Sequence, residues 1–115
     1  MDKKVDIIVN ILEKINAKDI SIYDTKDMTP FFEYMIVSTV ASSRQLSALG
    51  GYLKEEAAKS DFEIKGLEGA NSDEWVLADL GNVLVNAFTK DARERFDLDR
   101  LWKKLPRNKK EEKNE

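Results

Sequence analysis

Polar side chains interrupt an otherwise apolar run, "EWVLADLGNVLVNAF" at residues 74 to 88, and are the first candidates for chemistry. Trp75 is the second residue of this run, which also contains Asp79, Asn82 and Asn86. Three interpretations are open: a catalytic group on a sheet, ordinary turn and edge residues, or part of a partner-binding surface. Asp97 and Asp99 form a second candidate, because carboxylate pairs hold the metal ions of phosphoryl-transfer enzymes.

The composition excludes several kinds of catalysis. The 115 residues include no cysteine and no histidine, which removes thiol nucleophiles, disulfides, Cys/His zinc sites and histidine acid–base catalysis. The sequence therefore predicts neither a metal nor another cofactor. With 19 basic and 22 acidic residues the net charge is −3, so no overall positive field favours nucleic acid.

No stretch approaches the roughly 18 consecutive apolar residues of a membrane span. Charges interrupt the apolar residues of "MDKKVDIIVNILEKINAKD", unlike the core of a signal peptide. We therefore expect a cytoplasmic protein that does not contact a membrane.

Hydrophobic periodicity predicts the elements that would position these candidates. Two amphipathic helices are expected, over about residues 5–15 and from Ser42 or Ser43 to about Lys59. Strands are expected near 19–24, 34–39, 62–65, 75–79 and 82–88, and "KDARERFDLDRLWKKL" predicts a short terminal helix. Gly50 and Gly51 inside the second helix favour close approach of its backbone to a neighbouring layer, with a bend as the alternative.

This element order predicts an α/β fold with a single mixed five-stranded sheet and helices mainly on one face. We expect one domain over residues 1–106. The charged run at 107–115 is expected to be a disordered tail.

Residues 75–79 and 82–88 predict a hairpin in which Leu77 faces Leu84 and Trp75 faces Asn86. One face of it is small and aliphatic, as expected beneath helices. The other combines aromatic, aliphatic and polar side chains, which is typical of a binding surface: Trp75, Leu77, Asp79, Asn82, Leu84, Asn86 and Phe88.

Pattern alone leaves individual roles open. Asp79 suits a turn in which its carboxylate accepts backbone amides near Gly81. Trp75 fits core filling as well as a partner contact, and Asn86 fits a cross-strand amide or the binding face.

Three blocks, in this order, resemble the ribosomal silencing factor (RsfS, Iojap-related) family: "EYMIVSTVASSRQLSAL", "LEGANSDEWVLADLGNVLVNAF" and "RERFDLDRLW". The resemblance extends from the first helix to Pro106. The family often has glycine at Val40, histidine at Asn86, tyrosine at Phe96 and glutamate at Asp99. The missing glycine makes a phosphate-binding role for "STVASS" less expected.

The resemblance implies a nucleotidyltransferase-like topology and a non-catalytic translational repressor. Such a protein binds the large ribosomal subunit, chiefly its protein fourteen (uL-fourteen), and sterically blocks joining with the small subunit when nutrients are short. The implied partner-binding residues are Trp75, Leu77, Asp79, Asn86, Leu98, Arg100, Leu101, Trp102, Lys103 and Lys104.

Alternatives remain for this surface. Leu98, Leu101 and Trp102 would also suit a terminal helix docked on the domain's own core, with Asp97 near its N-cap. A minor ribosomal RNA contact would come from the basic residues near the C-terminus. The rival functions are a nucleotidyltransferase-like enzyme that uses Asp97 and Asp99 as a carboxylate pair, and a homodimer formed through the sheet face.

Overall fold

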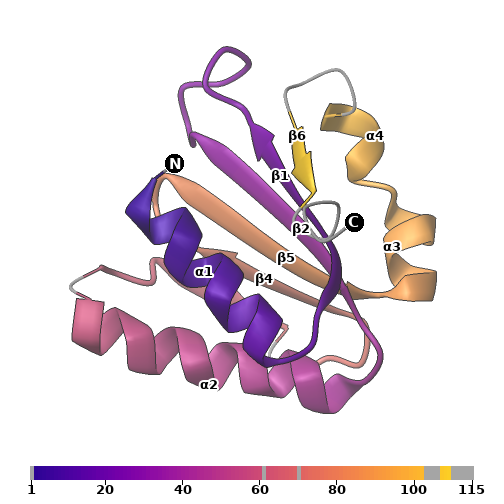
Figure 1. The fold of residues 1–115 in the computed structure, drawn as a ribbon. Helices are drawn as coiled ribbons and strands as arrows, with labels where there is room; N and C mark the ends of the chain where they lie inside the picture. Colours follow the sequence, from indigo (N-terminus) through magenta and orange to yellow (C-terminus); the bar gives the residue numbers. More distant parts are fainter. Residues whose placement is uncertain (1, 61, 70, 103–106, 110–115) are drawn as a thin grey trace.

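A mixed sheet with the strand order β3-β4-β5-β2-β1-β6 runs through the centre of the protein (Figure 1). This computed structural model describes residues 2–60, 62–69, 71–102 and 107–109. The strands are β1 (Lys18–Asp24), β2 (Tyr34–Val40), β3 (Gly66–Glu68), β4 (Trp75–Asp79), β5 (Val83–Thr89) and β6 (Arg107–Lys109). The helices are α1 (Lys3–Lys14), α2 (Ser43–Ser60), α3 (Lys90–Phe96) and α4 (Asp99–Trp102).

The sheet is mixed because β2 and β5 pair in parallel, while every other neighbouring pair is antiparallel. Four of the five expected strands are present near their expected positions and the fifth is displaced along the chain, and the mixed sheet confirms the predicted fold class. A sixth strand, β6, pairs with β1 at the edge and lies within the segment expected to be a tail. Residues 110–115 lie outside the described part. The nucleotidyltransferase-like topology stays a prediction.

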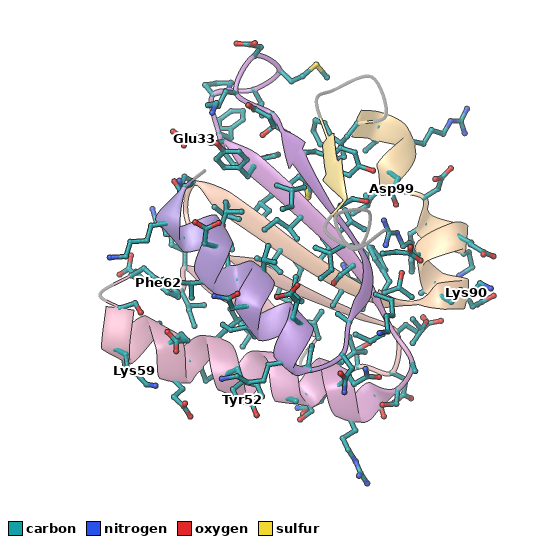
Figure 2. All side chains as sticks on the ribbon, in the orientation of Figure 1. Glu33, Tyr52, Lys59, Phe62, Lys90 and Asp99 are labelled. Atoms are coloured by element: carbon teal, nitrogen blue, oxygen red, sulfur yellow. The ribbon has the colours of Figure 1, made fainter. Side chains whose placement is uncertain are left out.

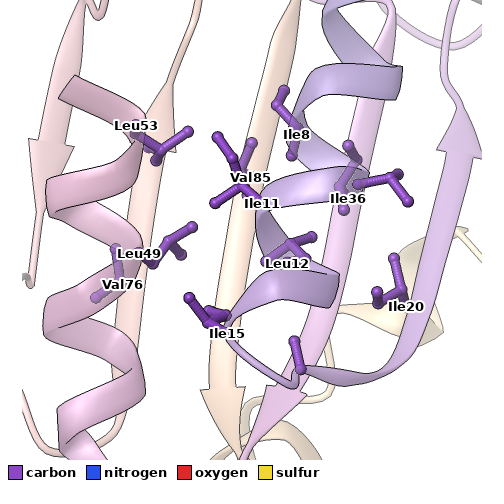
Figure 3. Close-up of a cluster of buried hydrophobic side chains, with 14 of the residues drawn as sticks. Ile8, Ile11, Leu12, Ile15, Ile20, Ile36, Leu49, Leu53, Val76 and Val85 are labelled. Carbon is purple, nitrogen blue, oxygen red and sulfur yellow. The ribbon is translucent and has the colours of Figure 1, made fainter. Parts of the chain in front are cut away.

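The two long helices, α1 and α2, cover one face of the sheet and enclose the main core (Figure 3). Their apolar stripes meet the aliphatic side chains of the strands, as the predicted helical spacing requires. Fully buried members include Ile8, Leu12, Leu49, Leu53 and Val85. Within the described part, no helix has the length and apolar character needed to cross a membrane.

The β4–β5 hairpin keeps the predicted faces, but its predicted register is wrong by two residues. Leu77 faces Asn86, and Trp75 faces Phe88. The reason is the turn, which lies at Gly81–Asn82 and has Gly81 at φ +91°. Positive φ at the first central position is the pattern of a type II′ turn and suits glycine, so Leu80 stays outside the turn. A shift of two residues preserves which side chains share a face.

Three local expectations also need correction. The strand expected at 62–65 forms instead at Gly66–Glu68, because β4 ends at Asp79, the partner of Gly66. Phe62 and Ile64 pack against the main core without entering the sheet. The single terminal helix is divided into α3 and α4 at Asp97, which adopts φ +51° and forms the C-cap of α3.

The glycine pair of α2 fits close packing only in part. Gly50 lies on the buried side of α2. A Cβ added at Gly51 would meet nothing within 4 Å, so no neighbouring layer requires glycine there. In contrast, Gly69 has φ +83°, and a Cβ there would lie 2.1 Å from the carbonyl oxygen of Trp75.

We expect opposite effects from two glycine-to-alanine substitutions. Gly69→Ala should lower the free energy of unfolding by more than about 1 kcal/mol, because it adds a clash to an unfavourable φ. Gly51→Ala should raise it by up to about 1 kcal/mol, since alanine favours helix and the space is open. Urea denaturation of both variants is the measurement, and effects of the same sign would contradict this account.

Candidate functional site

A second, smaller core lies on the face of the sheet opposite α1 and α2. Side chains alternate along β5, so Val85 joins the main core while Leu84 and Phe88 contribute to the smaller one. Its fully or nearly buried members are Tyr23, Met35, Val37, Phe88 and Ala92. The half-buried residues packed against it are Phe32, Trp75, Leu84, Leu98 and Trp102. The structure therefore brings predicted site residues from β4 and from the C-terminal helices to one cluster.

Trp75 is fixed by its neighbours on this face. Its ring stacks on Phe88 with centroids 4.9 Å apart and lies 5.0 Å from the ring of Phe96. Its Nε1 donates a hydrogen bond of 2.9 Å to Oδ1 of Asn86. Asn86 is only 1% exposed, so here it orients Trp75 and offers almost no surface of its own.

An open groove of about 290 Å³ runs beside Trp75. Trp75, Leu77 and Phe96 give it apolar walls, while Glu68 and Glu74 supply carboxylates. Glu74 accepts a 2.5 Å hydrogen bond from Arg95, whose guanidinium also lies over the ring of Phe96. The groove is therefore apolar inside and charged along its border.

The predicted residues in and just before α4 lie at different depths. Leu98, which precedes the helix, is half-buried and Arg100 is exposed, while Leu101 is 63% exposed. The ring of Trp102 meets the ring of Phe32 edge-on, with centroids 6.0 Å apart. Trp102 Nε1 is buried and has no hydrogen-bond partner within the described ranges. Lys103 and Lys104 lie outside the described residues.

Asp79 has the turn role that the sequence allows. Its Oδ1 accepts a 2.9 Å hydrogen bond from the Gly81 amide, within the hairpin turn. The side chain is only half-exposed. Asp79 therefore organises the end of the hairpin in this structure.

Asp97 and Asp99 do not form a carboxylate pair suited to metal binding. Both oxygens of Asp99 accept hydrogen bonds of 3.0 Å from Arg93, and Tyr23 donates a further one. Asp97 is exposed at the break between α3 and α4. Across the residues that the structure describes, no group of three or more potential ligands is arranged to hold a metal ion.

Two features of this face are absent from the sequence interpretation. One is the Arg93–Asp99 pair, whose residues are six positions apart and lie on different helices, so no single-helix spacing reveals it. The other is the β1–β2 loop, where Met28 is 58% and Phe31 is 83% exposed beside the contact of Phe32 with Trp102. The apolar doublet Phe31–Phe32 after Pro30 is the signal that the sequence offers for this loop.

The fold and this face define a class: a small α/β protein with an aromatic and aliphatic surface on the side of the sheet opposite the two long helices. A model of the family "Ribosomal silencing factor during starvation" matches residues 1–115. The chain belongs to the ribosomal silencing factor family.

Curated relatives agree with this assignment. The ribosomal silencing factor of Haemophilus influenzae is 36% identical over 98 residues, covering 85% of this chain and 96% of that protein. The mouse protein "Mitochondrial assembly of ribosomal large subunit protein 1" is 28% identical over 102 residues, covering 85% of this chain but 44% of its own.

Solved structures show the same fold. A crystal structure of a Chromobacterium violaceum protein has a TM-score of 0.82 and 35% identity, covering 90% of this chain and 88% of its own. A Bacillus halodurans crystal structure has a TM-score of 0.80 and 30% identity, covering 93% and 97%.

The Arg93–Asp99 pair predicts a specific pH dependence of stability. Partial burial alone would raise the pKa of Asp99, but the hydrogen bonds from Arg93 and Tyr23 and the guanidinium charge outweigh it, so this pKa lies below its usual value. Asp99 therefore stabilises the fold above its unfolded-state pKa of about 3.9, and this contribution is lost as the pH falls through the folded-state pKa.

Urea denaturation from pH 7 down to pH 2.5 tests this dependence. The stability difference between the wild-type protein and Asp99→Asn should shrink below about pH 4. Asp91→Asn, which removes a carboxylate whose side chain is 85% exposed, controls for the loss of one negative charge. A difference between wild type and Asp99→Asn that stays constant across the whole range would contradict the prediction.

Proposed function

We propose that this protein is a cytoplasmic translational repressor that binds the large ribosomal subunit, chiefly through that subunit's protein fourteen. Bound there, it blocks joining with the small subunit when nutrients are limited. Membership of the ribosomal silencing factor family supports the ribosomal partner. The observation that carries the choice of surface is the gathering of apolar side chains from β4 and α4 on one side of the sheet.

A protein interface needs a desolvated apolar centre and a charged border. Leu77 beside the groove and Leu101 on α4 supply exposed or half-exposed apolar surface, and Trp75 is held by its stacking on Phe88 and its hydrogen bond to Asn86. Rigid aromatic side chains lose little entropy on binding, which favours them as anchors. Glu68, Glu74 and Arg100 would form the border.

Steric obstruction requires no catalytic group, and we propose that the protein is not an enzyme. The Cα framework measures 33 × 31 × 28 Å. A rigid body of this size on the contact face of one subunit would hold the other subunit away. The engagement of Asp99 by Arg93 further supports a binding role over metal-assisted phosphoryl transfer.

The proposal includes two further interactions of minor importance, one with ribosomal RNA and one with a second copy of the protein. Basic residues near the C-terminus, including Lys103 and Lys104, would make a weak, salt-sensitive contact with ribosomal RNA. Self-association through the same face would compete with ribosome binding, and light scattering across a range of concentrations measures it.

Sucrose-gradient sedimentation of ribosomal subunits with the purified protein tests the proposed function. We expect the protein to migrate with the large subunit and to reduce the fraction of joined ribosomes. If it neither co-migrates nor reduces joining, the proposal is wrong.

A matched pair of variants tests the surface. Leu101→Glu should weaken binding to the large subunit about tenfold or more, because it puts an uncompensated charge at the apolar centre of the interface. Its stability should stay near that of the wild type, since Leu101 is 63% exposed. Ala58→Glu, at an exposed position of α2, adds the same charge on the other face and should bind normally.

Equal binding by the two variants would show that α4 does not contact the subunit. Equal loss in both would show that the added negative charge acts without regard to position, through repulsion by ribosomal RNA.

A further inference from the structure

Helix α4 is too short to be stable without contacts to the rest of the protein. It contains four residues, none of them fully buried, and an isolated helix of this length is unstable in water. Asp97, immediately before the turn into α4, is exposed and adopts a left-handed backbone conformation. The position of α4 on the sheet therefore depends on contacts made by its side chains and by Leu98.

Arg93 on α3 makes the central polar contact. Its Nε and Nη2 donate to the two oxygens of Asp99 at 3.0 Å each, in a bidentate pair. Its Nη1 donates to the Asp19 carbonyl at 2.6 Å and to Thr39 Oγ1 at 3.0 Å, and Nη2 also donates to Ser21 Oγ at 3.2 Å. All five N–H groups of the guanidinium are used.

These hydrogen bonds connect the sheet, helix α3 and helix α4. The acceptors other than Asp99 lie on β1 and β2, Arg93 lies on α3, and Asp99 is the first residue of α4. Tyr23 of β1 donates to Asp99 as well. Figure 2 shows Asp99 at the junction of the two short helices, facing the sheet.

We propose that Arg93 and Asp99 are positioning residues for ribosome binding: their ion pair fixes α4 so that Leu101 and Trp102 are presented in one orientation. The proposal rests on the proposed function and adds residues that lie beneath the binding surface. The side chains of Arg93 and Asp99 are only 15% and 25% exposed, so they act chiefly through α4.

The pair contributes to stability, but it lies outside the main core. The main core between the sheet and the two long helices contains neither residue, so we expect the domain to remain folded, with a lower free energy of unfolding, when the pair is broken. What is lost is the polar connection between α4 and the sheet, while the packing of Leu98 and Trp102 remains. Loss of one partner from a bidentate charged pair also leaves the other charge half-buried without its counter-charge, which favours detachment of α4.

Asp99→Asn tests the proposal by two separate measurements. Quenching of Trp102 fluorescence by acrylamide, in a Trp75→Phe background, reports whether α4 has loosened. Binding to the large subunit is measured without the Trp75→Phe change. We expect increased quenching and about tenfold or more weaker binding, while cooperative urea unfolding shows that the domain still folds.

Two controls bracket this variant. Asp99→Glu keeps the charge and both acceptor oxygens and should bind within about twofold of wild type, which restores the function through the same contact. Asp91→Asn breaks the exposed Arg95–Asp91 pair on α3, which does not reach α4, and should leave quenching and binding unchanged.

Unchanged binding of Asp99→Asn despite increased quenching would overturn the proposal, as would unchanged quenching. If Asp99→Asn does not fold, Arg93→Lys decides, since it keeps a positive charge but loses the bidentate geometry. Binding by Arg93→Lys within twofold of wild type would then overturn the proposal, and a severalfold loss would support it. Failure of the wild-type protein itself to bind overturns the proposed function, and with it this role for the pair.

Discussion

The burial of β5 on both faces is the constraint on which the rest of the structure depends. β5 lies between β4 and β2, and its side chains alternate between two separate cores. Val83, Val85 and Ala87 require the cover of α1 and α2, while Phe88 requires Trp75 and the C-terminal helices. If β5 had only one apolar face, the second side of the sheet would be polar. Trp75 would then have no buried aromatic side chain to pack against.

Periodicity predicted the elements that bury whole faces. The apolar stripes of α1 and α2, the strands at 19–24 and 34–39, and the division of the hairpin into two faces all follow from local spacing. The hairpin register was mispredicted because it depends on a single turn, where Gly81 and not Leu80 takes the positive φ. The short β3 strand depends on where β4 ends, which local sequence does not state.

The candidate surface was predictable in part. Trp75 and Leu77 follow from parity within one hairpin, and the family resemblance added α4. The burial of Asn86 was not predictable, because it depends on β2: the side-chain amide faces the sulfur of Met35 and the Ile36 carbonyl, 51 and 50 positions away. The Arg93 network was missed for the same reason, since its acceptors Asp19, Ser21 and Thr39 are distant in sequence. Polar contacts between residues far apart in the sequence do not produce any periodic pattern of apolar and polar residues, so periodicity cannot predict them.

The parallel pairing of β2 with β5 has a consequence for the order of folding. Tyr34 pairs with Val83, so this contact closes a long stretch of chain, whereas the β4–β5 hairpin closes over two residues. Loop-closure entropy favours the hairpin first, which sets Trp75 against Phe88 before β2 arrives. Arg93 reaches Thr39 only once β2 is in place, so the contact that links α4 through Arg93 to β2 forms after this long-range pairing. Because α4 has no buried residue of its own, its amides should exchange with solvent faster than those of β5.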